Sequence, residues 1–279
     1  MIIWLASYPK SGNTWVRSLL SAYYYSKNGN FNFELLKNID VYPQQKYFDV
    51  KIDKPGEINS YWDISQEKII SEKKIKILKT HNSLLALNGK DFTKPKYTLG
   101  IIYIVRDPRN VITSLKNHYD LDYEQSLDFM LNEKKYIYDI REKNDYSDFH
   151  FLSSWSQHYK SWLNDKSLKT ILIKYEDLET KTYETFEKIV TFVNNLSKSK
   201  TLLNKSKIQR CIETTSFDKL KKMEKENGFD EAIYSKKLKK KMNFFNLGSM
   251  NKWKNVIPQN YHNKINTSFE EDLKFLKYT

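Results

Sequence analysis

The sequence predicts an α/β protein in which a central parallel β-sheet is flanked by helices on both faces. Apolar runs of strand length recur at residues 2–7, 75–80, 99–105 and 168–174. The runs at 2–7 and 99–105 are almost continuously apolar, as in strands that are buried on both faces. Longer segments with helical spacing separate the runs, and crossover helices of this kind connect parallel strands.

The expected helices follow the strands closely. Apolar spacing and turn residues predict helices at 13–25, 108–119, 123–143, 147–164 and 183–196, two within 201–226, and one at 260–276. Residues 28–70 are irregular, with Asn, Pro and Gly scattered between aromatic residues, and residues 229–251 are basic without strong periodicity, as in a flap. We find no repeat or clear linker. We therefore expect a single domain over residues 1–279, with variable substrate loops around 28–70, 120–150 and 228–252.

The composition is that of a packed protein without a nucleic-acid surface. Hydrophobic residues make up 39% of the chain and aromatic residues 15%. The net charge of +13 comes mainly from lysines spread along the chain, with one dense block at 236–241, whereas nucleic-acid binding predicts a clustered basic face. No apolar run approaches the roughly 18 residues that span a membrane, and the first residues lack the basic region of a signal peptide. The lone Cys211 allows no intrachain disulfide and is expected to be buried, so we expect a cytoplasmic protein.

The first motif is the loop at residues 8–15 (Tyr-Pro-Lys-Ser-Gly-Asn-Thr-Trp), between the first strand and the first helix. Free N–H groups at a helix start and the helix dipole favour a phosphate there. Gly12 allows close backbone approach, Lys10 adds a cation, and the Trp15 ring can stack on a purine. The G-x-x-x-x-G-K-[ST] order is missing, as is an acidic strand end to hold the magnesium that phosphoryl transfer from ATP needs. A sulfuryl group carries less negative charge, so the loop favours sulfuryl transfer without a metal.

The second motif begins where the third expected strand ends. Arg106 follows that strand, at the edge where ligands of parallel sheets collect, and its guanidinium can bind a phosphate with two hydrogen bonds. Ser114 lies two helical turns further on and offers a hydroxyl donor. Arg109 is expected to form a local ion pair with Asp107 instead.

The third motif is Lys79-Thr80-His81, at the end of the second expected strand. Residues two apart on a strand point to the same side, so Lys79 and His81 are expected together. Imidazole titrates near neutral pH and can take the proton of an attacking alcohol. The other histidines are interpreted as structural, namely His118, His150, His158 and His262.

Together these motifs resemble those of the sulfotransferases that use 3′-phosphoadenosine 5′-phosphosulfate (PAPS). The resemblance implies a three-layer sandwich like that of the P-loop nucleotide hydrolases, with PAPS as co-substrate and 3′-phosphoadenosine 5′-phosphate (PAP) as product. It implies that His81 is the general base and that Lys10 and Lys79 stabilise the leaving phosphate. The donor-binding residues that it implies are Lys10, Ser11, Gly12, Asn13 and Thr14 for the 5′-phosphate, Trp15, Tyr175 and Phe217 for adenine, and Arg106, Ser114 and Gly248 for the 3′-phosphate.

The closing motif of many relatives, R-K-G-x-x-G-x-W-K, is only half present. The chain keeps Gly248 ahead of Trp253, but Asn-Leu stands in place of Arg-Lys, and Asn251 replaces the second glycine. We hypothesise that a lysine from 236–241, or Lys252, compensates for the missing cations.

The leading hypothesis is therefore an enzyme that moves a sulfuryl group from PAPS to an acceptor hydroxyl or amine. A small-molecule kinase of related fold and a non-catalytic nucleotide- or polyanion-binding module are the alternatives. The aromatic residues of 28–70 suit a small-molecule, lipid or carbohydrate acceptor equally, and the sequence does not indicate an oligomeric state.

Overall fold

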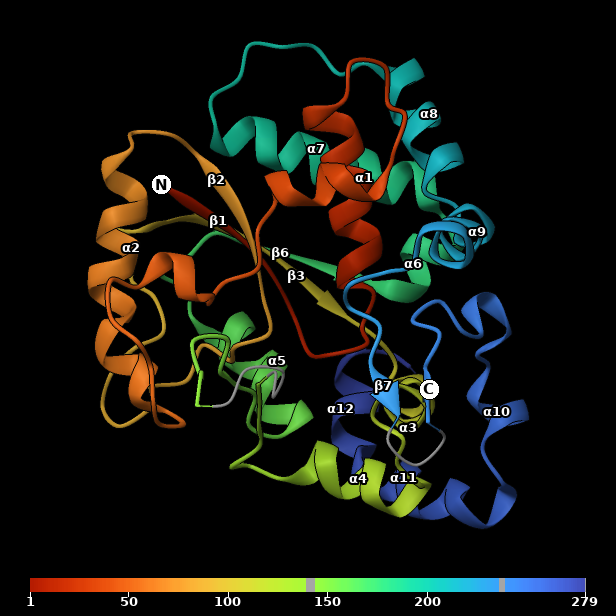
Figure 1. Ribbon diagram of the computed structural model, residues 1–279. Coiled ribbons are helices and arrows are strands. Elements are labelled where there is room, and N and C mark those ends of the chain that lie inside the picture. The colour runs from red at the N-terminus through yellow and green to blue at the C-terminus, as the bar shows by residue number, and fades with distance from the viewer. Residues whose placement is uncertain (139–143, 236–238, 279) are drawn as a thin grey trace.

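A sheet of four parallel strands lies at the centre of the computed structural model, which describes residues 1–138, 144–235 and 239–278 (Figure 1). The strands are β1 (Ile2–Ser7), β2 (Lys76–Thr80), β3 (Thr98–Val105) and β6 (Thr170–Lys174), in the order β2-β1-β3-β6. Each apolar run singled out in the sequence forms one of these strands. The predicted α/β class with a central parallel sheet is confirmed.

Strand β1 shows why both faces of the sheet must be covered. Its side chains alternate between two hydrophobic clusters: Ile2 and Trp4 join one, and Ile3 and Leu5 join the other. All four are fully buried. An isolated sheet of this kind would expose apolar surface on both sides, so helices pack on each face.

The helices form a layer on either side of the sheet. The cluster around Ile3 and Leu5 is completed by α1 (Asn13–Tyr25), η1 (Phe33–Asn38), α6 (Tyr175–Thr180), α7 (Thr182–Leu196), α8 (Lys205–Thr214) and α9 (Phe217–Asn227). The cluster around Ile2 and Trp4 is completed by α2 (Trp62–Ser71), α3 (Pro108–Tyr119), α4 (Tyr123–Leu131), α5 (Trp155–Asn164), α11 (His262–Ser268) and α12 (Glu270–Phe275). Figure 1 shows α1 and α7 above the sheet and α4 and α5 below it.

Short elements connect these layers. They are the 3₁₀ helices η2 (Gln45–Tyr47), η3 (Glu57–Tyr61), η4 (Gly248–Met250) and η5 (Gln259–Tyr261), the helix α10 (Trp253–Val256), and the strand pairs β4 (Tyr136–Ile137) with β5 (His150–Phe151) and β7 (Tyr234–Ser235) with β8 (Lys240–Lys241). The region 28–70 is irregular up to α2, as predicted. The flap predicted at 229–251 contains β7, β8 and η4 in its described part.

Three predicted helices differ from the structure. The helix expected at 123–143 ends at Leu131, because Asn132 is extended and the chain then enters β4; residues 139–143 of that prediction lie outside the described residues. The helix expected at 147–164 begins only after Ser154, whose hydroxyl accepts the N–H of Gln157 as an N-cap. The helix expected at 260–276 is divided into η5, α11 and α12.

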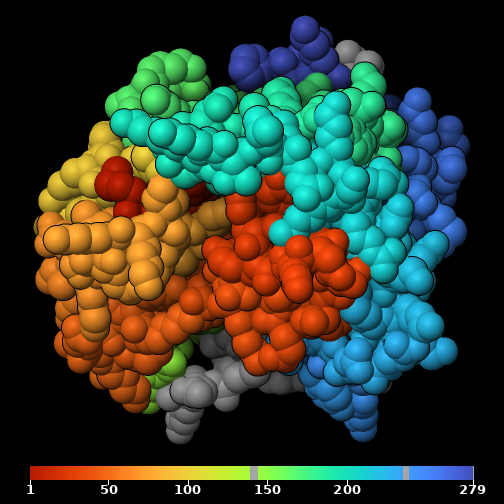
Figure 2. All heavy atoms as spheres, turned by 90° about the horizontal axis from the view of Figure 1, so that it is seen from above, coloured from red at the N-terminus to blue at the C-terminus, as the bar shows by residue number. Residues whose placement is uncertain are grey.

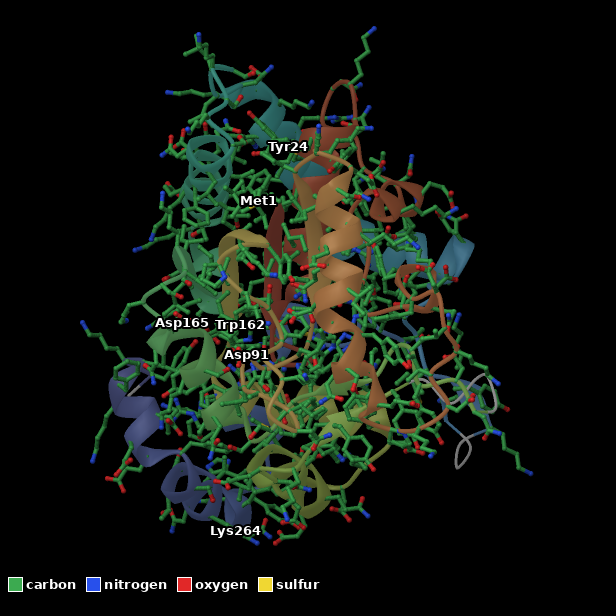
Figure 3. All side chains as sticks on the ribbon, turned by 90° about the vertical axis from the view of Figure 1, so that its left-hand side faces the viewer. Met1, Tyr24, Asp91, Trp162, Asp165 and Lys264 are labelled. Carbon is green, nitrogen blue, oxygen red and sulfur yellow. The ribbon has the colours of Figure 1, made fainter. Side chains whose placement is uncertain are left out.

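Large aromatic side chains fill the interior. Trp155 and Trp162, both interpreted as core residues from their helical spacing, are almost completely buried, as is Cys211. In Figure 3, Tyr24 lies at the upper end of the molecule and Lys264 at the lower end, with Trp162 in between. No helix in the described ranges has the length and apolarity that crossing a membrane requires.

Candidate active site

Each of the four parallel strands is followed directly by a residue that the sequence singled out. Tyr8 follows β1, His81 follows β2, Arg106 follows β3 and Tyr175 follows β6. The strand register brings these ends together, because Ala6 pairs with Thr80, Ser7 with Ile104 and Val105 with Lys174. Motifs that are between 25 and 167 residues apart in the chain thus lie along one edge of the sheet.

The loop between β1 and α1 has the backbone of an anion cradle. Lys10 has a φ of 66° and Gly12 a φ of 98°, and the Gly12 carbonyl accepts the N–H groups of Trp15 and Val16 at the start of α1. A Cβ atom on Gly12 would lie 2.4 Å from Cδ2 of Tyr175. Glycine is therefore needed here both for the backbone conformation and for the close approach of the tyrosine ring.

Polar side chains of the loop divide into anchored and unpartnered groups. Asn13 is anchored, because its Nδ2 donates to the Leu5 carbonyl and to Ser7 Oγ, both at 3.1 Å. Ser11 Oγ is fully buried and has no hydrogen-bond partner among the described residues, and the same holds for the indole N–H of Trp15. A buried polar group without a partner fits a site that receives a polar ligand.

His81 is held in the tautomer that a general base requires. Its Nδ1 lies 2.8 Å from the carbonyl oxygen of Ser7, and because a carbonyl can only accept, Nδ1 carries the proton. The lone pair is then on Nε2. Burial, followed by the positive charge of Lys79, lowers the pKa of His81 well below its usual value, so the ring is neutral at pH 7.

Two buried lysines, one in the loop and one in β2, add positive charge to the site. Burial lowers the pKa of Lys10 to about 7, aided by the charges of Lys79 and Arg106 and opposed by Glu231. The Lys10 ammonium lies 3.6 Å from the centre of the Phe244 ring. Lys79 is 4% exposed, and its Nζ donates to Oε1 of Glu231 at 2.8 Å. Its pKa is also lowered, chiefly by burial.

Arg106 connects the loop with helix α3. Its Nη1 donates to the Lys10 carbonyl at 3.2 Å and to Ser114 Oγ at 3.3 Å, while its Nε has no partner among the described residues. Ser114 Oγ also accepts from Asn251 Nδ2 at 3.1 Å. Because both lone pairs of this hydroxyl accept, its own proton is left to donate to a ligand.

Aromatic rings continue the site beyond Arg106. The Arg106 guanidinium lies 3.9 Å from the centre of the Tyr175 ring, and the Trp15 ring lies 5.9 Å from it at 63°. Phe217, at the start of α9, contacts Gly248 instead: a Cβ on Gly248 would lie 2.7 Å from that ring. The predicted residues thus form one continuous group around the loop and a second pair between α9 and η4.

Two residues around the site were not predicted from the sequence. Glu231 contacts the loop from the segment after α9, and Thr14 Oγ1 donates to its Oε2 at 2.9 Å. Arg17, one turn into α1 from Thr14, donates from Nη1 to Glu231 Oε1 at 2.8 Å. Arg17 is a rare arginine three residues after Thr14 on one helix face, a signal that could have been noticed; no local signal marked Glu231.

Asn251, noted in the sequence only as a departure from the closing motif, is an integral part of the structure. It is 5% exposed, donates to the Asn110 carbonyl at 3.0 Å as well as to Ser114, and accepts a hydrogen bond from Thr113 Oγ1. A residue in the place of a motif glycine thus fixes the C-terminal segment to α3.

The lysines proposed as substitutes occupy different environments. Lys252 forms an ion pair with Glu179 at 3.0 Å. Lys239, Lys240 and Lys241 are exposed, and residues 236–238 lie outside the described part of the chain. None of these contacts tests the compensation hypothesis.

The predictions for Arg109 and for His158 are confirmed. Arg109 forms the expected pair with Asp107, at 2.7 Å. His158 is structural, with Nδ1 2.7 Å from Tyr103 Oη and Nε2 donating to the His81 carbonyl at 3.0 Å. His150, however, lies next to the site, with its ring centre 5.9 Å from that of His81.

The chain is similar to known proteins in sequence and in fold. A family model described as "Sulfotransferase domain" matches residues 2–277. Sulfotransferase 1 family member D1 of Mus musculus is 25% identical over 285 residues, covering 97% of this chain and 81% of the relative. Sulfotransferase 1B1 of Canis lupus familiaris is 25% identical over 286 residues, with 96% and 82% covered.

Two solved structures have a similar fold. Mouse sulfotransferase SULT7A1 complexed with PAP aligns with a TM-score of 0.60 at 20% identity, covering 98% of this chain and 84% of that one. Retinol dehydratase in complex with androsterone and inactive cofactor PAP aligns with a TM-score of 0.58 at 16% identity, covering 98% and 80%.

Proposed function

This chain belongs to the sulfotransferase family, and we propose that it transfers the sulfuryl group of PAPS to an acceptor hydroxyl or amine by in-line displacement. One observation carries the proposal: the four strand ends bring a neutral His81, the loop with Lys10, Lys79 of β2, and Arg106 with Ser114 to one edge of the sheet. A base, a cationic cluster and an anion cradle at one edge suit transfer of an anionic group.

The proposed donor site uses the loop for the 5′-phosphosulfate and α3 for the 3′-phosphate. Lys10, Ser11, Gly12, Asn13 and Thr14 surround the 5′ group. The unpartnered Ser11 Oγ supports this, since a donor oxygen would supply the missing partner. Gly12 and the helix start supply backbone N–H groups, which favour anions.

The 3′-phosphate is proposed to lie at Arg106 and Ser114. The free Arg106 Nε and the uncommitted proton of Ser114 support this assignment. Gly248 is proposed to border the 3′-phosphate as well. In the same proposal, a lysine from 236–241 or Lys252 supplies a further positive charge to the 3′-phosphate. Lys252 would first have to break its ion pair with Glu179.

Adenine is proposed to contact Trp15, Tyr175 and Phe217. The rings of Trp15 and Tyr175 adjoin each other and Gly12, so a base near them extends from the phosphate loop. The unpartnered Trp15 Nε1 adds a donor at this place.

In the proposed reaction, His81 Nε2 takes the proton of the acceptor hydroxyl while its oxygen attacks sulfur. The bond between sulfur and the 5′-phosphate oxygen breaks, and PAP leaves with that bond's electron pair. Lys10 and Lys79 stabilise the charge that develops on the leaving oxygen, and no metal takes part in the proposal. Positioning and electrostatics contribute most of the rate in this scheme.

The function is tested by transfer of radiolabelled sulfate from PAPS to a panel of phenols, alcohols, sugars, lipids and amines. With any acceptor that is sulfated, we expect His81→Ala to lower kcat by roughly 10²–10⁴-fold, because the base is lost while the donor site is kept. The Kd for PAP, measured by titration calorimetry, should change little. His262→Ala, a histidine from α11, is the matched control and should leave kcat unchanged. Normal turnover by the His81 variant would remove this residue from the mechanism.

The same assay separates the alternatives. Magnesium-dependent turnover of ATP without transfer from PAPS would favour a kinase, and tight PAP binding without transfer to any acceptor would favour a binding module. We further propose that residues 1–279 form a single domain and that the protein is located in the cytoplasm. The proposal leaves the acceptor open among small molecules, lipids and carbohydrates that contact the loops around 28–70, 120–150 and 228–252.

A further inference from the structure

Glu231 is the carboxylate that contacts three groups of the donor-site region at once. Its Oε1 accepts from Lys79 Nζ and from Arg17 Nη1, each at 2.8 Å, and its Oε2 accepts from Thr14 Oγ1 at 2.9 Å. Thr14 and Lys79 are groups that the proposed function assigns to the phosphosulfate. A carboxylate therefore occupies hydrogen-bonding positions that the oxygens of an anionic donor would use.

The surrounding charges make this place an anion site in the absence of a donor. Lys10 and Arg106 lie close enough to affect one another electrostatically, and Lys79 and Arg17 contact the carboxylate directly. Although burial opposes ionisation, the charges of Lys79 and Arg17 hold the pKa of Glu231 well below its usual range. The carboxylate is thus a fixed negative charge within a cationic cluster.

Arg17 is held in place independently of Glu231. Its Nε donates to the Ile39 carbonyl at 2.6 Å and its Nη2 to the Leu36 carbonyl at 2.8 Å, both at the end of η1. Only the third nitrogen, Nη1, points to Glu231. If the carboxylate left, this nitrogen would remain available to an anion in the same place.

Apolar contacts hold the segment that carries Glu231. The centre of the Phe229 ring lies 4.7 Å from the centre of the Phe33 ring and 4.9 Å from that of the Phe244 ring. The Glu224 carboxylate accepts hydrogen bonds from the backbone N–H groups of Phe244 and Phe245. Figure 2 shows the light-blue surface of this region beside the orange-red surface that follows α1. Aromatic packing thus keeps Glu231 near the loop without using its carboxylate.

We propose that Glu231 is an internal competitor of the donor: its carboxylate occupies the phosphosulfate subsite in the free enzyme and is displaced when the donor binds. This inference rests on the proposed function, because it takes the subsite from it. The competition lowers donor affinity and keeps Lys79 and Arg17 paired when no donor is present. A buried cation without a counter-charge is costly, so an internal carboxylate stabilises the free enzyme.

The test compares the isosteric variant Glu231→Gln with the wild-type chain. We expect the Kd for PAP, measured by titration calorimetry, to fall at least tenfold, because the donor no longer displaces an ion-paired carboxylate. The melting temperature of the free enzyme should fall in this variant, and saturating PAP should narrow the difference from wild type. Asp230→Asn removes the same charge one residue away and should change the Kd by less than twofold.

A second variant, Glu231→Asp, and a second probe, inorganic sulfate, test the same competition independently. Glu231→Asp keeps the charge but shortens the side chain by one methylene, so it should also tighten PAP binding, and it tests the idea should the Gln variant fail to fold. Inorganic sulfate, titrated by the shift in melting temperature, probes the subsite without the nucleotide. It should stabilise Glu231→Gln at lower concentrations than it stabilises wild type.

The outcomes separate the two proposals. PAP binding that is unchanged or weaker in both Glu231 variants overturns the competition while leaving the donor site intact. No PAP binding by any variant, with sulfate still preferring Glu231→Gln, overturns the donor assignment and supports the competition at an anion site. No response to either probe overturns both.

Discussion

Gly12→Ala tests whether the loop depends on the close approach of Tyr175. Gly12 has a φ of 98°, outside the range that an L-residue adopts without strain, and the added methyl would lie 2.4 Å from Cδ2 and 3.0 Å from Cε2 of the Tyr175 ring. The Tyr175 ring has two close neighbours. The Arg106 guanidinium lies 3.9 Å from the ring centre, and the centre of the Trp15 ring lies 5.9 Å from it. The alanine variant must therefore displace the ring or the loop.

The expected cost has two parts. Left-handed backbone costs an L-residue about 1–2 kcal/mol. Displacing Tyr175 forfeits an aromatic pair worth about 0.5–1.5 kcal/mol and a cation–π contact worth about 0.5–2 kcal/mol. Together these predict a loss of about 2–5.5 kcal/mol in the free energy of unfolding, or a fall in Tm of about 3–9 °C for a chain of this size. Because the same ring adjoins the proposed adenine site, the Kd for PAP should rise at least tenfold.

Gly89→Ala is the matched control, because Gly89 has a φ of 73° but no atom within 4 Å of the added methyl. It should show the backbone cost alone, about 1–2 kcal/mol, and no change in PAP binding. The assay is urea or thermal unfolding of both variants, with PAP titration. In a Tyr175→Ala background, Gly12→Ala should lower the free energy of unfolding by no more than Gly89→Ala does. If Gly12→Ala and Gly89→Ala cost the same in the wild-type background, the steric argument is wrong.

Two further predictions concern pH. Lys10 has a pKa of about 7 in the free enzyme because it is buried beside Lys79 and Arg106. A bound phosphate favours the ammonium form, so PAP binding should take up a proton and weaken by up to about tenfold per unit from pH 7 to 9; Lys10→Arg, which stays charged, should flatten this dependence in calorimetry. Burial lowers the pKa of His150 to about 4 and that of His158 to about 3. The unfolded chain therefore binds protons below about pH 6.5 that the folded chain does not, so stability is lost as pH falls, by about 3 kcal/mol per pH unit for the pair. Urea unfolding at pH 7 and pH 5 measures this loss, and equal unfolding free energies at the two pH values would contradict it.

The sequence was most informative where local pattern and strand topology act together. The loop, Lys79 with His81, and Arg106 with Ser114 could all be predicted, because each follows an apolar strand and the carboxyl ends of parallel strands share one edge. Helices α1 and α3 were predicted to the residue, since Gly12 and Pro108 mark their beginnings. The length of α4 was not predictable, because the pairing of β4 with β5 depends on contacts that local periodicity does not report.

By itself, the sequence determined the α/β class, the order of the strands along the chain and the residues at each strand end. Those features follow from side-chain periodicity and from residue chemistry over short distances. Only the tertiary structure decided that Glu231, 214 residues after Arg17, places its carboxylate among Thr14, Arg17 and Lys79, and that Asn251 fixes Ser114. Such contacts join segments through packing, here of Phe229 against Phe33, and no local pattern encodes which distant carboxylate a buried cation will meet.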